Sequence, residues 1–235
     1  MNKSIRIYFI LFIGTFAMAQ NQADSLKIKM NLKWNNETLQ LDKIYHSKSD
    51  SLELTTVKFY ISGIELHYID NSSFVQKNSY HLIDIEDSNS LKIPICTKSN
   101  KAISKITFSI GVDSLASVSG ALSGDLDATK GMYWAWQSGF INMKIEGKSN
   151  SCNTRKNEFH FHIGGYLKPY YAMQTIQIPI NYNNTVTLSA VEAPINVDLA
   201  KLFDEIHLNE TNSIMIPGKQ AMKIADLSTT MFSVE

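Results

Sequence analysis

The sequence has no excess of charge of either sign. Its 235 residues include 22 Lys and Arg against 22 Asp and Glu, which gives a formal net charge of +0 at pH 7. A protein that binds nucleic acid by neutralising phosphates needs an excess of basic residues or a basic patch. The composition therefore gives no electrostatic case for nucleic acid as a partner.

Long apolar runs are lacking after the N-terminus. The run at residues 7–13 follows Lys3 and Arg6 and precedes Ala17-Met18-Ala19. This layout is typical of a secretory signal peptide, and the run is too short to span a bilayer, which takes about 20 apolar residues. We expect residues 1–19 to be a signal peptide and the mature chain to be secreted or periplasmic, without a transmembrane segment. Gln20 stands where a lipid anchor would need a cysteine.

Cysteine is scarce, with only Cys96 and Cys152. In an exported protein these two residues can form a disulfide, and closing a loop of this length contributes about 4 kcal/mol in the chain-entropy model. The alternative is two free thiols, one of which could ligate Cu(I), because soft thiolates favour that ion. The spacing leaves both alternatives open.

Common catalytic motifs are also missing. The sequence has no G-x-S-x-G elbow, no H-E-x-x-H pair and no phosphate-binding P-loop, so we do not expect an enzyme. It has no linker rich in Pro, Gly and Ser and no short-period repeat. We therefore expect residues 20–235 to form a single domain.

Alternation of apolar and polar residues is the dominant pattern. Leu26 to Trp34 alternates strictly, and the run from Val57 to Tyr68 changes phase at Gly63, which predicts a β-bulge there. Further strands are predicted at Ile106–Ile110, Ile141–Ile145, Phe159–Ile163, Ile176–Ile180, Val186–Leu188 and Ile195–Leu199. About eight such strands indicate an all-β fold, an antiparallel β-sandwich.

Helical pattern is confined mainly to the end of the chain. Pro217-Gly218 precedes a segment from Lys219 to Met231 that predicts a C-terminal helix. A short helix is predicted at Ala200–Ile206, with Asp198 as its N-cap.

Two histidines two positions apart are the clearest candidate for a metal site. His160 and His162 alternate with Phe159, Phe161 and Ile163, so both imidazoles should lie on one side of a sheet. Imidazole suits copper, and His67 could add a third ligand if its strand lies beside theirs. Two solvated surface histidines are the alternative, and His46, His81 and His207 are expected to be solvated.

Several motifs resemble those of one family. The segment from Gly131 to Phe140 reads G-M-Y-W-A-W-Q-S-G-F, and it follows Gly111-Val112-Asp113-Ser114 and Asp125-Leu126-Asp127. These motifs, with Phe161 to Gly165 and Ile216-Pro217-Gly218, are similar to the motifs of the MbnP-like family. Their residues resemble those of a Bacteroidetes branch of that family. The resemblance extends over the mature chain from about Leu26.

The resemblance implies a function and a partner. Members of the family are periplasmic or secreted copper binders, some encoded beside a MauG-type dihaem peroxidase. In the branch from methane oxidisers, that partner oxidises a tryptophan to kynurenine, which helps to bind copper. For this chain the resemblance implies copper as cofactor, such a peroxidase as partner, and Trp134 or Trp136 as the modified residue.

Other interpretations of the same residues stay open. Trp134 and Trp136 are also explained by packing, since aromatic rings bury much apolar area. Asp113, Asp125 and Asp127 are expected to cap backbone N–H groups in an ordered loop, with a Ca²⁺ site as the alternative. The alternatives to a copper carrier are an interaction module without metal and a copper-dependent redox enzyme at the His160 and His162 pair.

Overall fold

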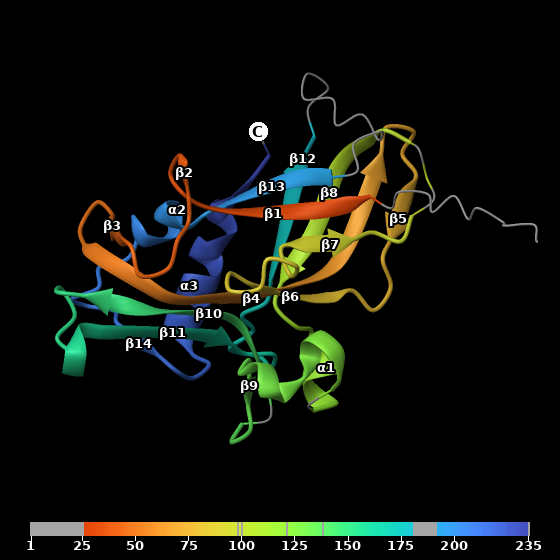
Figure 1. The fold of residues 1–235 in the computed structure, drawn as a ribbon. Coiled ribbons are helices and arrows are strands. Elements are labelled where there is room, and N and C mark those ends of the chain that lie inside the picture. The colour runs from red at the N-terminus through yellow and green to blue at the C-terminus, as the bar shows by residue number, and fades with distance from the viewer. Residues whose placement is uncertain are drawn as a thin grey trace, which may run out of the picture.

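The computed structural model describes residues 26–97, 99, 101–120, 122–137, 139–180 and 192–234. The signal peptide predicted at residues 1–19 and the strand predicted at Val186–Leu188 lie outside the described residues. Within these residues, two β-sheets form a sandwich, with β1 and β13 in one layer and β4, β10 and β11 in the other (Figure 1). The predicted all-β sandwich is confirmed.

The smaller sheet joins the first and the last of the described strands. Its five strands are β15 (Phe232–Ser233), β13 (Glu192–Asp198), β1 (Lys27–Trp34), β2 (Glu37–Thr38) and β7 (Lys92–Pro94). β1 and β13 run parallel, from the pair Lys27↔Glu192 to the pair Lys33↔Asp198. The sandwich is therefore not antiparallel throughout. A parallel pair needs a long crossover connection, and here the strands of the larger sheet provide it.

The larger sheet has ten strands. Its main order is β12 (Gln174–Pro179), β8 (Ile103–Ile110), β4 (Ser51–Tyr68), β10 (Gly139–Ser149), β11 (Glu158–Gly164) and β14 (Ser213–Ile214). Short strands add to it: β3 (Ile44–His46), β5 (Ser73–Val75) and β6 (Tyr80–Asp84) pair with β4, and β9 (Tyr133–Trp134) pairs with β10. Among the described strands, eight have five or more residues.

The alternating residues face the core as the sequence predicts. In β1 every second side chain, from Ile28 to Trp34, is buried. In β4 the register shifts between Ser62 and Glu65, and Gly63 has φ +59, so the predicted bulge is confirmed. A positive φ is a conformation that glycine adopts without steric cost. The bulge keeps Phe59, Ile61, Ile64 and Leu66 in the core despite the change of phase.

In the part of the chain that the structure describes, three helices pack against the sheets. They are α1 (Ser114–Val118), α2 (Leu199–Phe203) and α3 (Lys219–Ser228), and four 3-10 turns accompany them: η1 (Gly124–Leu126), η2 (Ala128–Lys130), η3 (Arg155–Asn157) and η4 (Thr229–Met231). The predicted C-terminal helix is confirmed, as is the N-cap Asp198, which accepts a hydrogen bond from the Ala200 N–H. None of the helices in the described residues is long and apolar enough to cross a membrane.

Two buried clusters lie on opposite faces of the larger sheet. The main core fills the space between the sheets, where the Phe203 ring on α2 lies 5.7 Å from Trp34 and 5.6 Å from Phe159. The second cluster lies on the outer face under α1 and β9, and includes Tyr60, Trp134 and Phe140. The outer face of β4, β10 and β11 is therefore partly covered at one end.

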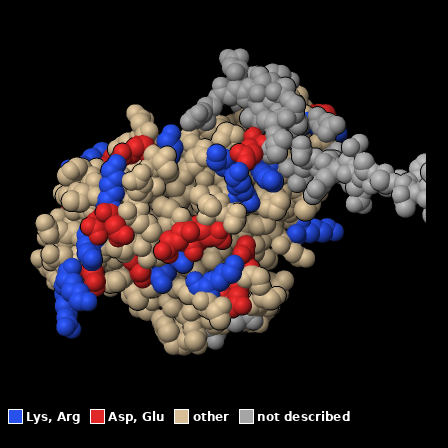
Figure 2. Space-filling model, viewed as in Figure 1, with Lys and Arg blue, Asp and Glu red and all other residues tan. Residues whose placement is uncertain are grey.

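Charges of both signs are interspersed on the surface. Figure 2 shows Lys and Arg beside Asp and Glu over the face that is in view. Close ion pairs account for part of this pattern, such as Lys58 with Asp84 at 2.8 Å and Lys92 with Glu192 at 2.8 Å. The view shows no large field of one sign, which agrees with the balanced composition.

Candidate metal centre

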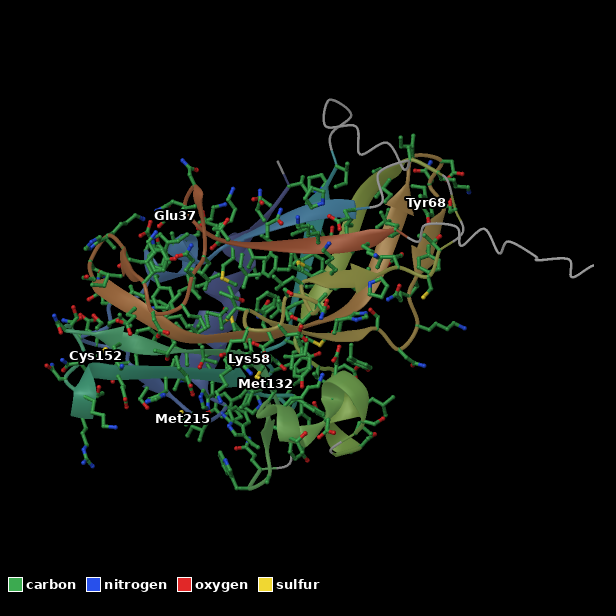
Figure 3. All side chains as sticks on the ribbon, viewed as in Figure 1. Glu37, Lys58, Tyr68, Met132, Cys152 and Met215 are labelled. Atoms are coloured by element: carbon green, nitrogen blue, oxygen red, sulfur yellow. The ribbon has the colours of Figure 1, made fainter. Side chains whose placement is uncertain are left out.

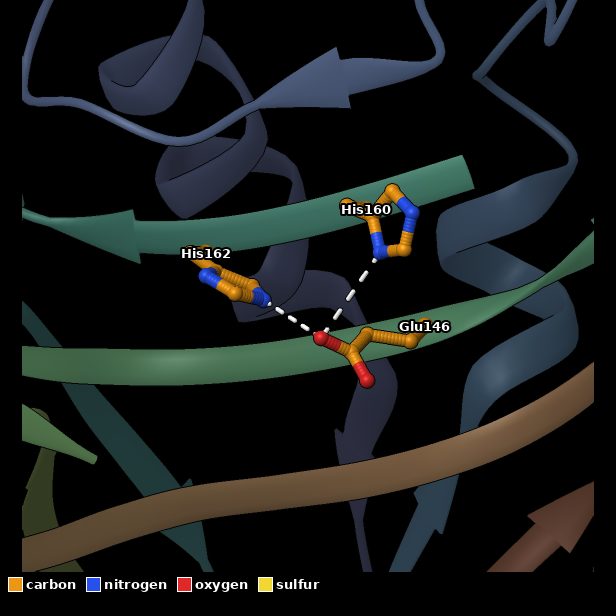
Figure 4. Close-up of side chains that lie close together, drawn as sticks. All are labelled: Glu146, His160 and His162. Carbon is orange, nitrogen blue, oxygen red and sulfur yellow. Dashed lines mark hydrogen bonds and ion pairs between the residues drawn. The ribbon is translucent and has the colours of Figure 1, made fainter. Parts of the chain in front are cut away.

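Three side chains meet on the outer face of the larger sheet. Nδ1 of His160 and Nε2 of His162 lie 3.7 Å and 2.6 Å from Oε1 of Glu146 (Figure 4). One potential ligand atom from each of the three residues lies within 4.8 Å of the others. This is the only such cluster of His, Cys, Asp and Glu that the described residues contain.

The strand register explains why these residues meet. In the antiparallel pair of β10 and β11, Glu146 lies opposite His160 and Lys144 lies opposite His162. Residues that lie opposite each other in a sheet point to the same side, and so do residues two apart in one strand. Phe159 and Phe161 point into the main core, so both imidazoles lie on the same, outer side, and the shared side is as the sequence predicts.

Glu146 is held as a carboxylate. The hydrogen bond from His162 is the main cause that lowers the pKa of Glu146 to about 2, and burial opposes it. The Lys144 ammonium, 3.6 Å from Oε1, and the Thr56 hydroxyl, 3.2 Å from Oε2, also favour the charged form. The site therefore presents a negative charge to two imidazoles at neutral pH.

This arrangement can exchange a proton for a cation. An ionised carboxylate only accepts hydrogen bonds, so Nε2 of His162 donates to Glu146. A metal ion bound by that nitrogen would replace the proton, because histidine ligates metals with a lone pair. His162 is 8% exposed, whereas His160 is more open, so an ion would reach the site from the His160 side.

His67 does not join this cluster. Its strand β4 is separated from β11 by β10, so the condition for a third ligand from His67 is not met. Thr56 is the β4 residue opposite Glu146, and His67 lies eleven positions further along, about 35 Å of strand. His67 instead lies 3.1 Å from the Thr107 hydroxyl and 3.7 Å from Glu65.

The other histidines divide into two groups. His46 and His207 are exposed, as predicted for solvated side chains. His81 is half-buried, and its Nε2 lies 3.2 Å from Gln76 Nε2. The prediction that His81 is a solvated side chain is therefore wrong, and burial lowers its pKa.

Trp134 is buried beside the metal candidates. It is 6% exposed, and its ring occupies the position where a side chain at Gly164 would lie: a Cβ there would come within 2.7 Å of Cζ3. Gly164 is two residues after His162, about 7 Å along the strand and on the same face. The Trp134 ring therefore lies on the same outer face as His162, two residues further along β11.

Trp136 is exposed. Its exposed fraction is 65%, and its ring centroid lies 6.0 Å from that of Trp134. The two tryptophans that the sequence left unranked thus differ in environment. Trp134 is part of the second buried cluster, whereas Trp136 lies between the Trp134 ring and the surface.

The acidic loop residues cap backbone groups as predicted. Asp113 accepts from the Ala116 N–H, Asp127 from the Thr129 N–H and Asp125 from the Leu82 N–H. Asp113 also accepts a hydrogen bond from the Tyr80 hydroxyl, and Asp125 pairs with Lys130. These contacts account for the three carboxylates without a cation.

The two cysteines are free thiols in this structure. Cys96 is exposed after β7, whereas Cys152 is 2% exposed in the turn that follows β10 (Figure 3). Cys96 bonds through its backbone N–H to Gln76, while Cys152 lies near Asp50. Burial is the main cause that raises the pKa of the Cys152 thiol to about 11, and the Asp50 carboxylate adds to it.

We predict that the two thiols react at very different rates. In the native protein at pH 8, an aromatic disulfide reagent should modify Cys96 quickly and Cys152 only after unfolding, since the thiolate is the nucleophile. The measurement is thiol release with and without denaturant, with Cys96→Ser as the control that removes the fast phase. Release of no thiol before reduction would instead show a disulfide.

Glu146 is the site residue that sequence reasoning missed. The sequence pattern did indicate its direction: Met143 and Ile145 are the apolar positions of an alternating strand, so Glu146 is expected on the solvent-facing side of the sheet. Its relation to His160 depends on the register of β10 against β11, which the eight residues between the strands do not specify.

Comparison with known proteins gives two findings. A family model described as MbnP matches residues 23–216. Among solved structures, MbnP from Methylosinus trichosporium is similar in fold, with a TM-score of 0.58, 17% identity, and coverage of 82% of this chain and 81% of that chain. A search of curated proteins finds no match.

Proposed function

This chain belongs to the MbnP family, and on that basis we propose that it is an exported copper-binding protein. Residues 1–19 serve as a signal peptide that directs the mature chain to the periplasm or the exterior. Residues 20–235 form a single domain, supported by a main core that includes residues from Leu26 to Phe232. The protein acts as a binder rather than as an enzyme.

The observation that carries the proposal is the cluster of His160, His162 and Glu146. Two imidazoles and a carboxylate are a donor set that suits copper, whereas hard cations such as Ca²⁺ take oxygen ligands only. The Glu146 carboxylate also holds His162 in one orientation, as hydrogen-bonded carboxylates do for metal-binding histidines. The residues present therefore fit the ion that the family resemblance implies.

The same face supports a role for Trp134 in maturation. Oxidation of an indole to kynurenine opens the five-membered ring, adds two oxygen atoms and releases one carbon as formate after hydrolysis. The product carries a ketone and an aniline amine in place of a donor-only N–H. At Trp134 these groups would lie over Gly164, two residues along β11 from His162, which is close enough for a role at the copper site.

A partner haem enzyme would supply the oxidant. We assign this step to a dihaem peroxidase of the MauG type that uses hydrogen peroxide, the partner that the family resemblance implies. Trp136 supports this assignment, because its exposed ring lies 6.0 Å from Trp134. An electron can leave Trp134 through Trp136 toward a partner docked outside, without contact between the partner and the buried ring.

We predict that protein isolated from its native host contains copper and kynurenine at position 134. Peptide mass spectrometry should find the modified residue at Trp134 with Trp136 unmodified, and metal analysis should find about one copper ion per chain. The matched control is protein produced in a host without a dihaem peroxidase, in which both residues should be intact tryptophan.

Other results would favour the alternatives. Intact Trp134 with full copper content would remove the maturation step and keep the copper site. Native protein without metal, and without affinity for Cu(I) or Cu(II), would favour an interaction module. Turnover of a reductant with O₂ or peroxide by the copper-loaded protein would favour a redox enzyme.

A further inference from the structure

An additional sulfur-bearing side chain lies at the edge of the candidate metal centre. β14 runs parallel to β11 as the outermost strand, with His160 paired to Ser213 and Phe161 paired to Ile214. Met215 is the next residue, directly after the end of β14 at Ile214, whose partner Phe161 is the neighbour of His162 in β11. Figure 3 shows Met215 at this edge of the larger sheet.

The burial pattern around Ile214 is consistent with Met215 on the face that carries the histidines. Ile214 is 4% exposed and packs in the main core with Phe161, whereas Ser213 and Met215 are exposed. Successive side chains of an extended segment point to opposite faces. Ser213 therefore lies on the outer face beside His160, and an extended chain would carry Met215 to the same face near His162.

Distance and flexibility allow the sulfur to reach the site. Neighbouring strands lie about 4.8 Å apart, and methionine has three rotatable side-chain bonds. Met215 is 42% exposed, so no packing contact in the core holds its thioether away from the imidazoles. On the opposite side of His162 stands Lys144, whose ammonium lies 3.6 Å from the Glu146 carboxylate.

We infer that Met215 supplies a thioether ligand to Cu(I) at the His160 and His162 pair. Soft sulfur ligands favour Cu(I), whereas the carboxylate of Glu146 is a harder donor that suits Cu(II). Glu146 lies on β10 and Met215 directly follows β14, on the two sides of β11, so each oxidation state of copper has a suitable donor close to the imidazoles. This inference rests on the proposed copper site and adds a specificity for its reduced form.

The test replaces the sulfur and keeps the bulk. Met215→Leu should weaken Cu(I) binding by about tenfold or more and change Cu(II) binding by less than about threefold, because only the soft ion uses the thioether. The measurement is titration of the mature protein with Cu(I) against a colorimetric chelator, and with Cu(II) alone. X-ray absorption of the Cu(I) form should show a sulfur neighbour in wild type and none in Met215→Leu.

Met222→Leu is the matched control. Met222 lies on α3, whose buried residues Ala221, Ile224 and Ala225 pack on the core side of β11, so its sulfur is on the other face of the sheet. This variant should bind both ions as wild type does. Equal Cu(I) affinity in Met215→Leu and wild type would overturn the role of Met215 and leave the proposed function standing. Failure of wild type to bind copper would overturn both.

Discussion

The double variant His160→Ala, His162→Ala is expected to lose more than about 100-fold in copper affinity. Loss of a group that merely supports a ligand costs about 10- to 100-fold, so loss of two ligands should cost more. Glu146 remains in this variant, but a single carboxylate beside Lys144 is a weak site for a cation. The measurement is competitive titration with Cu(I) and Cu(II), compared with wild type.

The control for this prediction uses two histidines outside the cluster. His46 and His207 are exposed, and neither belongs to the group of converging ligand atoms. The variant His46→Ala, His207→Ala should therefore keep the wild-type affinity. Glu146→Gln should fall between the two, since it keeps the shape of the side chain and removes its charge. Wild-type affinity in the double variant at 160 and 162 would remove this site from the protein.

Phe203→Ala is expected to lower the free energy of unfolding by about 3–5 kcal/mol, the cost of removing a fully buried phenylalanine. Phe203 is 0% exposed, and its ring contacts Trp34 of the smaller sheet and Phe159 and Phe161 of the larger one. Its loss would leave a cavity where the two sheets and α2 meet. The measurement is urea unfolding followed by tryptophan fluorescence.

An exposed residue provides the comparison. Leu167 is 61% exposed, so Leu167→Ala should change the free energy of unfolding by less than about 0.5 kcal/mol. Phe159 and Phe161 alternate with His160 and His162, so the same cavity should also loosen the strand that presents the imidazoles. A loss of less than about 1 kcal/mol in Phe203→Ala would show that the core closes around the missing ring.

The alternation of apolar and polar residues was sufficient to predict the strands that have one solvent-exposed face. In β1 every second residue is buried, and in β4 the phase change at Gly63 marks the bulge. Side-chain direction follows directly from a period of two, so the shared face of His160 and His162 was also predictable. The short helix at α2 followed from its cap, Asp198.

Contacts between strands were not predictable in the same way. β6 buries Leu82 in the outer cluster and Ile83 in the main core. Both of its faces are buried there, so its sequence shows no alternation of apolar and polar residues. The meeting of Glu146 with His160, and of β14 with β11, depends on register and strand order. These are set by packing over the whole sheet, which is also why His67 lies far from the site it was expected to join.

The parallel pairing of β1 with β13 has a consequence for the order of folding. Lys27 and Glu192 pair across 165 positions of sequence, so the smaller sheet cannot be completed until nearly the whole chain has been synthesised. Pairing between such distant segments forms slowly, because the intervening chain must first be brought together. For a chain that we propose to be exported, this topology delays closure of the sandwich until the C-terminal strands have also emerged.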